Sequence, residues 1–189
     1  MFEQQVKPYL LKDSDTRLVS HTMHFFGIGE SMLEDRLRSL MEKSLNPTVA
    51  PYAKTGEVQL RVTARVKGGE DPNALLEPVM EQIRQTVGEF LYGVDVGDLQ
   101  TAVVRLLTEK ERKVAVAESC TGGYLAKRIT DVSGSSKVFE CGVCSYSNRI
   151  KHQLLGVSEQ TLAEYGAISE QTAAEMASGV RNLSGADIG

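Results

Sequence analysis

Residues 113–123 read Lys-Val-Ala-Val-Ala-Glu-Ser-Cys-Thr-Gly-Gly, a short apolar run followed by a glycine-rich turn. The continuously apolar residues 113–117 are typical of a buried strand in a parallel sheet. We expect a helix to begin directly after the turn and to end near Thr130. A strand, a turn and a helix in this order predict an α/β domain, in which ligands bind beside the carboxyl ends of the strands.

The same alternation continues on both sides of this segment. Asp98 is expected to cap a preceding helix, and a second apolar strand is expected at 138–146. Ser158 and Ser169 are natural N-caps for later helices. The helices predicted after the second strand are 147–155, 158–165 and 170–183, and residues 185–188 resemble the approach to a further strand.

The first half of the chain predicts a smaller α/β unit. Residues 57–66 alternate between apolar and polar side chains, which indicates a strand with one wet face. The predicted order is strand, helix, strand, helix, strand, with strands at 16–26, 57–66 and 91–94. We therefore divide the chain into a small α/β domain (16–95) and a second α/β domain (96–189). Residues 1–15 have helical spacing without a cap, so they form either a short docking helix or the tail of an upstream domain.

The composition is that of a globular protein. The 189 residues are 41% hydrophobic and 24% charged, with a net charge of −4, which argues against a disordered chain and against a strong attraction to nucleic acid or acidic lipid. No apolar stretch approaches the roughly 20 residues of a membrane span. Three cysteines without a disulfide framework favour a reducing cytoplasm.

Ser119 stands between the predicted buried strand and the predicted helix. The free N–H groups of a helix start can hold an anion or a developing oxyanion. Gly122 and Gly123 let backbone and substrate approach closely. Ser119 is therefore a candidate nucleophile. An ordinary strand-to-helix turn, with Ser119 and Thr121 as caps, is the alternative interpretation.

A serine nucleophile needs a base, and Lys151 is the first candidate. Residues 146–151 follow the second apolar strand, so they should open at the same sheet edge as Ser119. A partly buried lysine can be neutral and take a proton from serine. Tyr146 could relay or orient that proton. The alternative is that Lys151 is a surface residue of a helix.

The histidines and cysteines fit chemical roles less well. His21 and His24 fall on opposite faces of a first-domain strand, and His152 has no acidic residue placed to complete a triad. Cys141 and Cys144 resemble half of a redox or zinc site, but on a strand they point to opposite faces and no second pair completes a metal site. Another interpretation makes Cys120 the nucleophile, although a small buried residue is simpler.

The first domain has the strand–helix alternation of nucleic-acid-binding KH modules. Those modules clamp phosphates with a Gly-x-x-Gly loop between two helices. Here Gly27-Ile28-Gly29 is shorter and lies between a strand and a helix. The basic residues Arg61, Arg65 and Lys67 occupy a face expected to be solvated. These features do not favour nucleic-acid binding. A binding or assembly module without catalysis, including one that binds nucleic acid, stays as the alternative to an enzyme.

Several segments closely resemble the competence/damage-inducible protein family (CinA). In the second half these are VAVAESCTGGYLAKRITDVSGSS (114–136), YSNRIK (146–151) and LLGVSEQTLAEYGAISEQTAAEMASG (154–179). Upstream, FFGIGES and NPTVAPYAKTGEVQLRVTA resemble the KH-type middle domain of the family. MFEQQVKPYL resembles the exit from the family's first, molybdopterin-biosynthesis-like domain.

The resemblance implies an amidase. The C-terminal domain of the family is similar to nicotinamide-nucleotide amidases, which deamidate nicotinamide mononucleotide to nicotinate mononucleotide and release ammonia. It implies no metal or organic cofactor, a small-molecule substrate and a homo-oligomer, whereas the composition argues against a nucleic-acid or membrane partner. On matching positions, Ser119 is the nucleophile, Lys151 its base and Tyr146 an assistant. The oxyanion and phosphate contacts fall on Thr121, Gly122 and Gly123.

The resemblance also implies sequence beyond both ends of this chain. The family's first domain, associated with ADP-ribose hydrolysis, would be represented only by its last helix. The amidase domain of the family continues past Gly189 into a strand and a Thr-Gly-Ile-Ala-Gly-Pro loop that faces the active site. We therefore expect a truncated amidase domain that is inactive in this form.

Overall fold

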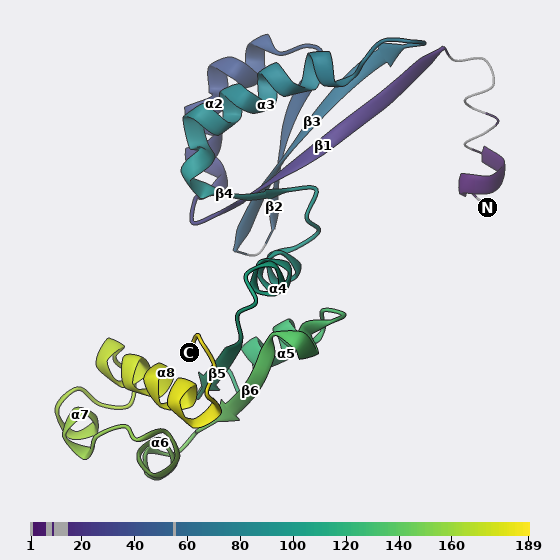
Figure 1. Ribbon diagram of the computed structural model, residues 1–189. Helices are drawn as coiled ribbons and strands as arrows, with labels where there is room; N and C mark the ends of the chain where they lie inside the picture. Colours follow the sequence, from purple (N-terminus) through teal and green to yellow (C-terminus); the bar gives the residue numbers. More distant parts are fainter. Residues whose placement is uncertain (1, 7–8, 10–14, 55) are drawn as a thin grey trace. The chain divides into compact units, whose positions relative to one another are not determined.

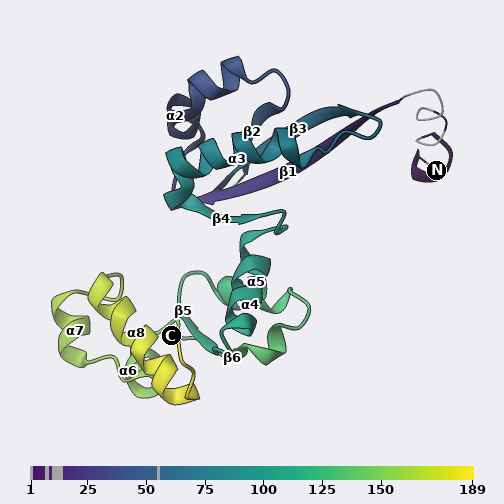
Figure 2. The ribbon, with the colours of Figure 1, turned by 45° about the horizontal axis from the view of Figure 1, so that its top comes forward.

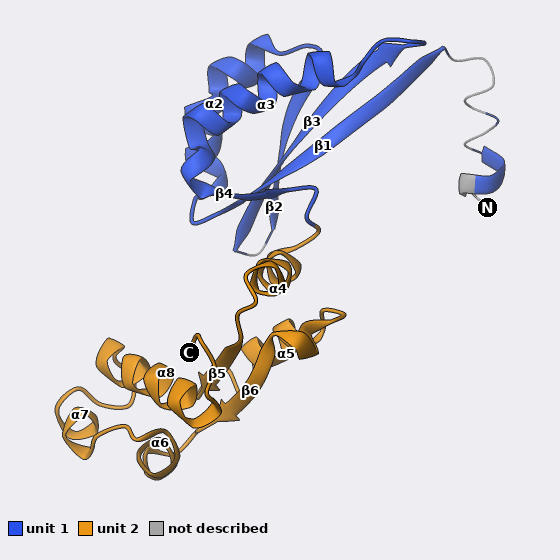
Figure 3. Cartoon of the chain, viewed as in Figure 1, with its two compact units in different colours: residues 1–96 blue, residues 97–189 orange. Residues whose placement is uncertain are grey.

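The computed structural model describes residues 2–6, 9, 15–54 and 56–189. The chain forms two compact units, residues 1–96 and 97–189 (Figure 3). Most of the predicted N-terminal tail, 1–15, lies outside the described residues, apart from a short π-helical turn, η1 (Phe2–Val6). No helix within the described ranges is long and apolar enough to cross a membrane.

The first unit is a four-stranded antiparallel sheet with two helices on one face (Figure 1, Figure 2). The strand order is β2-β3-β1-β4. The helices are α2 (Glu30–Lys43) and α3 (Asn73–Val87), and a short 3-10 helix, η2 (Gly88–Phe90), follows α3. The strands are β1 (Thr16–Phe26), β2 (Thr48–Lys54), β3 (Glu57–Lys67) and β4 (Leu91–Val94).

The alternation predicted for the second strand is confirmed along most of β3. Its apolar side chains are buried beneath the helices, whereas Arg61, Arg65 and Lys67 are exposed. The pattern changes at the start of the strand, where Glu57 and Gln59 are buried. These polar side chains satisfy their hydrogen bonds internally, Glu57 with the Tyr92 hydroxyl and Gln59 with His24.

Strand β2 was not predicted. Residues 48–54, to which the sequence assigned no element, pair with β3 in antiparallel register and form a hairpin with it. Pro51 lacks a backbone N–H and breaks the alternation, which hides the strand from a search for period-two patterns. Proline is tolerated here because β2 is at the edge of the sheet and one side of its backbone needs no partner.

The second unit has helices on both faces of a small parallel sheet, which confirms the predicted α/β class. Ala115 and Ala117 pack with Met176 and Val180 of α8 on one face. Val116 packs on the other face with α4 and α5. The elements are α4 (Leu99–Glu109), β5 (Val114–Glu118), α5 (Tyr124–Thr130), η3 (Ser135–Lys137), β6 (Phe139–Cys144), α6 (Asn148–Leu155), α7 (Glu159–Glu164) and α8 (Glu170–Ser184).

The predicted helix caps are confirmed. Asp98 accepts a hydrogen bond from the N–H of Thr101 at the start of α4. Ser158 does the same for Thr161 in α7, and Ser169 for Thr172 in α8. Each cap satisfies one of the N–H groups that a helix start leaves without a partner.

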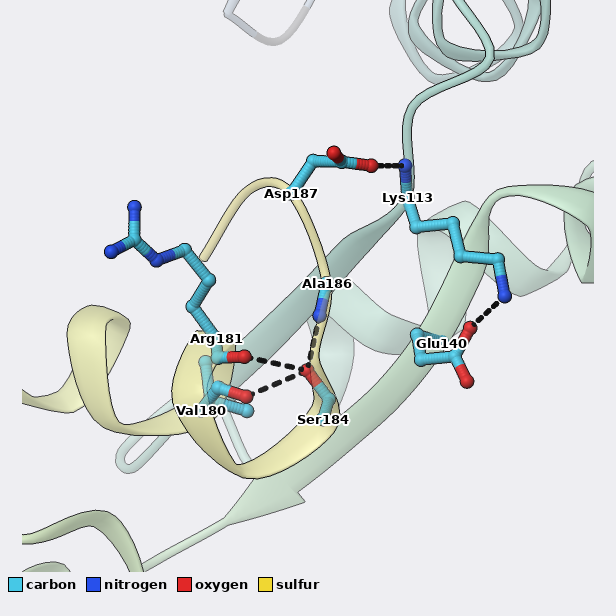
Figure 4. A network of polar contacts seen from close by, with 7 residues as sticks. All are labelled: Lys113, Glu140, Val180, Arg181, Ser184, Ala186 and Asp187. Atoms are coloured by element: carbon cyan, nitrogen blue, oxygen red, sulfur yellow. Dashed lines mark hydrogen bonds and ion pairs between the residues drawn. The ribbon is translucent and has the colours of Figure 1, made fainter.

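The segment after α8 returns to the sheet, as the sequence predicted for residues 185–188. Ile188 forms a parallel bridge with Val114 of β5. Asp187 holds this approach in place, since its carboxylate accepts from the Lys113 N–H at 2.8 Å and pairs with Arg112 at 2.7 Å. Figure 4 shows the Asp187–Lys113 hydrogen bond beside the Lys113–Glu140 ion pair.

A close approach of α8 to the end of α6 yields a stability test. A Cβ added at Gly179 would lie 1.9 Å from the carbonyl oxygen of Leu155. Because a backbone atom must move, we expect Gly179→Ala to lower the free energy of unfolding by about 1–3 kcal/mol. The exposed neighbour Ser178→Ala is the control. Urea denaturation measures both, and equal midpoints would contradict the tight packing.

Candidate active site

Ser119 lies at the carboxyl end of β5, where the chain turns into α5. The turn depends on two glycines in left-handed conformations, Gly122 at φ 61° and Gly123 at φ 97°. Other residues adopt such angles at a cost, so the glycines set the shape of the loop. The loop leaves Ser119 half-buried.

Lys151 reaches Ser119 from the first turns of α6. This helix starts right after β6, with the Ser147 side chain as its N-cap. Parallel pairing places the ends of β5 and β6 at the same edge of the sheet. The Lys151 side chain is only 1% exposed. Its Nζ lies 3.0 Å from Ser119 Oγ, so the structure brings together the two residues that the sequence singled out.

Three oxygen atoms surround the Lys151 amine. Besides Ser119 Oγ, these are the backbone carbonyl oxygens of Ser145 at 2.8 Å and Tyr146 at 3.2 Å. A charged ammonium donates to all three. A neutral amine donates to the two carbonyls, which leaves its lone pair directed at the Ser119 hydroxyl. The same geometry therefore accommodates both protonation states of a base.

Tyr146 contacts Lys151 in a way the sequence did not predict. Its backbone carbonyl accepts the hydrogen bond, while its side chain is 79% exposed at the mouth of the adjoining cavity. Among the described residues its phenol hydroxyl makes no hydrogen bond. An assisting role for this hydroxyl stays a prediction.

Glu118 is a buried charged residue beside the candidate nucleophile that the sequence analysis did not single out. Its side chain is buried, and its two carboxylate oxygens accept from the N–H groups of Leu125 at 3.0 Å and Ala126 at 2.8 Å. Burial alone would raise the pKa of Glu118. The bonds from Ala126 and Leu125, together with Thr121 and Gly123, outweigh burial and lower this pKa below its usual value. Glu118 is therefore an anion at neutral pH.

The expectation of free N–H groups at the start of α5 is therefore wrong for much of this helix start. The N–H of Gly122 bonds the Ser119 carbonyl, and that of Tyr124 bonds the Thr121 carbonyl. Within the described part of the chain, the N–H groups of Cys120 and Thr121 have no partner. These two amides directly follow the candidate nucleophile, where an oxyanion would form.

A cavity of about 720 Å³ adjoins Ser119 and Lys151. Its walls come largely from aliphatic side chains of β5, α5 and α8, including Leu125, Ile129 and Met176. A cavity of this size accommodates a small organic ligand. The half-buried serine, the buried amine and the exposed Cys120 are the reactive groups along its wall.

The remaining candidates have other partners. His21 bonds Asp95 at 2.6 Å, the buried His24 contacts Gln59 and Tyr92, and His152 is exposed with Nδ1 2.7 Å from the Val157 carbonyl. All three cysteines are free. Over the described residues, no group of three or more His, Cys, Asp or Glu side chains is placed to hold a metal ion.

Comparisons with known proteins cover nearly the whole chain. Residues 97–189 match the family model described as the CinA C-terminal domain, and residues 20–93 match the damage-inducible protein CinA KH domain. A CinA-like protein of Kosmotoga olearia is 46% identical over 189 residues, which are 100% of this chain and 46% of that protein. A putative competence-damage inducible protein of Caldicellulosiruptor bescii is 47% identical, with the same coverage.

A solved structure is similar over part of the chain. The competence/damage inducible protein CihA from Agrobacterium tumefaciens has 40% sequence identity and a TM-score of 0.46, over 47% of this chain and 53% of that one. The chain spans about half the length of the Kosmotoga olearia and Caldicellulosiruptor bescii relatives.

Ser145 carries a buried hydroxyl beside this site. Its Oγ has no hydrogen-bond partner among the described residues, whereas its backbone carbonyl holds Lys151. An unpaired buried hydroxyl costs about 1–3 kcal/mol. We therefore expect Ser145→Ala to leave the free energy of unfolding unchanged or to raise it by about 1 kcal/mol. A loss of stability in urea denaturation would reveal a partner for this hydroxyl.

Proposed function

Because the chain belongs to the CinA family of competence/damage-inducible proteins, we propose that its second unit carries a nicotinamide-nucleotide amidase site. The reaction is hydrolysis of the carboxamide of nicotinamide mononucleotide to nicotinate mononucleotide and ammonia. One observation carries the proposal. A fully buried lysine amine lies 3.0 Å from a serine hydroxyl on the wall of a ligand-sized cavity.

The first half of the reaction forms a covalent intermediate. Lys151, as a neutral amine, takes the proton of Ser119 as Oγ attacks the carboxamide carbon. The resulting oxyanion accepts from the free N–H groups of Cys120 and Thr121. The intermediate collapses when Lys151 returns the proton to the leaving nitrogen. Ammonia leaves, and the nicotinoyl group stays on Ser119 as an ester.

The second half releases the product by the same groups. Lys151 takes a proton from water, which attacks the ester carbon. The oxyanion forms again at the same amides, and Ser119 leaves with the proton from Lys151. The two carbonyls of Ser145 and Tyr146 keep the amine in one orientation through both halves.

Loss of the serine hydroxyl tests the nucleophile. We expect Ser119→Ala to lower ammonia release from nicotinamide mononucleotide by at least ~1,000-fold while circular dichroism is unchanged, because the hydroxyl that forms the proposed ester is lost. Cys144→Ala, which removes an exposed thiol outside the cavity, is the control. Turnover is measured in this chain and in the full-length Kosmotoga olearia relative, since the chain spans about half its length. Turnover in Ser119→Ala near that of the unmodified protein would remove Ser119 from the mechanism.

Replacement of the amine tests the base. Lys151→Met keeps an unbranched side chain in the buried position, and Lys151→Arg keeps the charge. We expect both to lose at least ~100-fold in rate, because neither can accept a proton at working pH. Thermal unfolding and circular dichroism identify any variant that fails to fold. An active Arg variant would exclude Lys151 as a base.

A further inference from the structure

The structure assigns to Glu118 a positioning role in the reaction of Ser119: its carboxylate fixes the nucleophile loop 119–123 by joining the end of β5 to the start of α5. This inference rests on the proposed function. Glu118 touches neither Ser119 Oγ nor Lys151 Nζ through a hydrogen bond within the described chain, so it acts through the backbone and is not itself a catalytic residue.

The side chain of Glu118 replaces a cap that α5 lacks. The N-cap position is Gly123, which has no side chain, and no cap hydrogen bond is made there. Glu118 lies on the strand side of the loop and reaches across to the N–H groups of Leu125 and Ala126. The segment that carries Ser119 is thus held at both of its ends by one residue. Its charge also suits the positive end of the helix.

The backbone of Glu118 connects the same residue to the base. Its carbonyl accepts from the Ser145 N–H at 2.8 Å. The Ser145 carbonyl in turn accepts from Lys151 Nζ at 2.8 Å. Glu118 therefore contacts both sides of the Ser119–Lys151 pair, with the side chain on the nucleophile side and the backbone on the base side. Small displacements of such a pair lower the rate strongly, because reacting atoms need a near-attack geometry.

Glu118→Gln removes the charged carboxylate but keeps a side chain of nearly the same size and shape. Both oxygens of Glu118 accept from N–H donors, whereas glutamine offers one acceptor and one amino group that would face a donor. Glu118→Asp keeps the charge but is one methylene shorter. We expect a rate between that of the Gln variant and that of the unmodified protein, which is partial rescue by the conservative change.

Glu175 provides a matched control within the same unit. Its carboxylate accepts from the Ser158 N–H at 2.7 Å and from Thr161 Oγ at 2.6 Å, at the start of α7. These bonds lower its pKa, as comparable bonds do for Glu118. Glu175 does not line the cavity. Glu175→Gln therefore removes a carboxylate that holds the start of another helix, at a position away from Ser119. We expect kcat to be unchanged in this variant.

The experiment combines amide hydrogen exchange with steady-state kinetics. In the 189-residue chain, we expect Glu118→Gln to speed exchange at Leu125 and Ala126 by about tenfold or more, the effect of losing a charge-assisted hydrogen bond. In the full-length Kosmotoga olearia relative, we expect the matching substitution to lower kcat per folded molecule roughly 10- to 100-fold while KM stays within about twofold.

The outcomes distinguish this inference from the proposed function. Unchanged exchange at both amides would overturn the anchor. Faster exchange with the kcat of the unmodified protein, or an equal loss of kcat in Glu175→Gln, would overturn the positioning role and leave the amidase intact. If the unmodified proteins release no ammonia from nicotinamide mononucleotide, the proposed function fails, and the positioning role fails with it. The exchange data still show whether the Glu118 carboxylate holds the N–H groups of Leu125 and Ala126.

Discussion

The burial of the Lys151 amine constrains most of the second unit. A buried polar group without hydrogen-bond partners is unfavourable, so the oxygen neighbours of this amine must be held in place in a stable fold. Two of those neighbours are carbonyls at the end of β6, and the third is the hydroxyl at the end of β5. This requires that the two strands run parallel and finish at one edge. The close packing of Gly179 against Leu155 then fixes the far end of the same helix.

Much of the fold could be predicted because local patterns coincide with burial. Strand β1 matches its predicted residues, 16–26, and the serine caps of α7 and α8 match as well. Strand β2 could not be predicted in this way, since its stability comes from pairing with β3 and not from its own pattern. Strand β6 is shorter than predicted, because residues 145 and 146 turn toward α6 and present their carbonyls to Lys151.

The sequence predicted that Ser119 and Lys151 lie near each other, but not which atoms surround them. The motif places Ser119 and Lys151 at one sheet edge, yet the same sequence is also compatible with a lysine whose side chain is exposed. One signal was available in the sequence: Lys151 and Leu155 are four residues apart, so they share a helix face, and the apolar Leu155 marks that face as one to be buried. The structure shows both side chains buried. Glu118 carries a weaker signal. A helix that starts at Gly123 has no side-chain cap, so another acceptor must serve its N–H groups.

The anion at the start of α5 also constrains how a mononucleotide can bind. The resemblance implied phosphate contacts at Thr121, Gly122 and Gly123, but Thr121 and Gly123 already donate toward the Glu118 carboxylate. A phosphate at these donors would meet a buried negative charge in a region of low dielectric, where like charges repel strongly. The phosphate contacts at Thr121, Gly122 and Gly123 stay a prediction, and the Glu118 carboxylate is the negative charge that such contacts would have to accommodate.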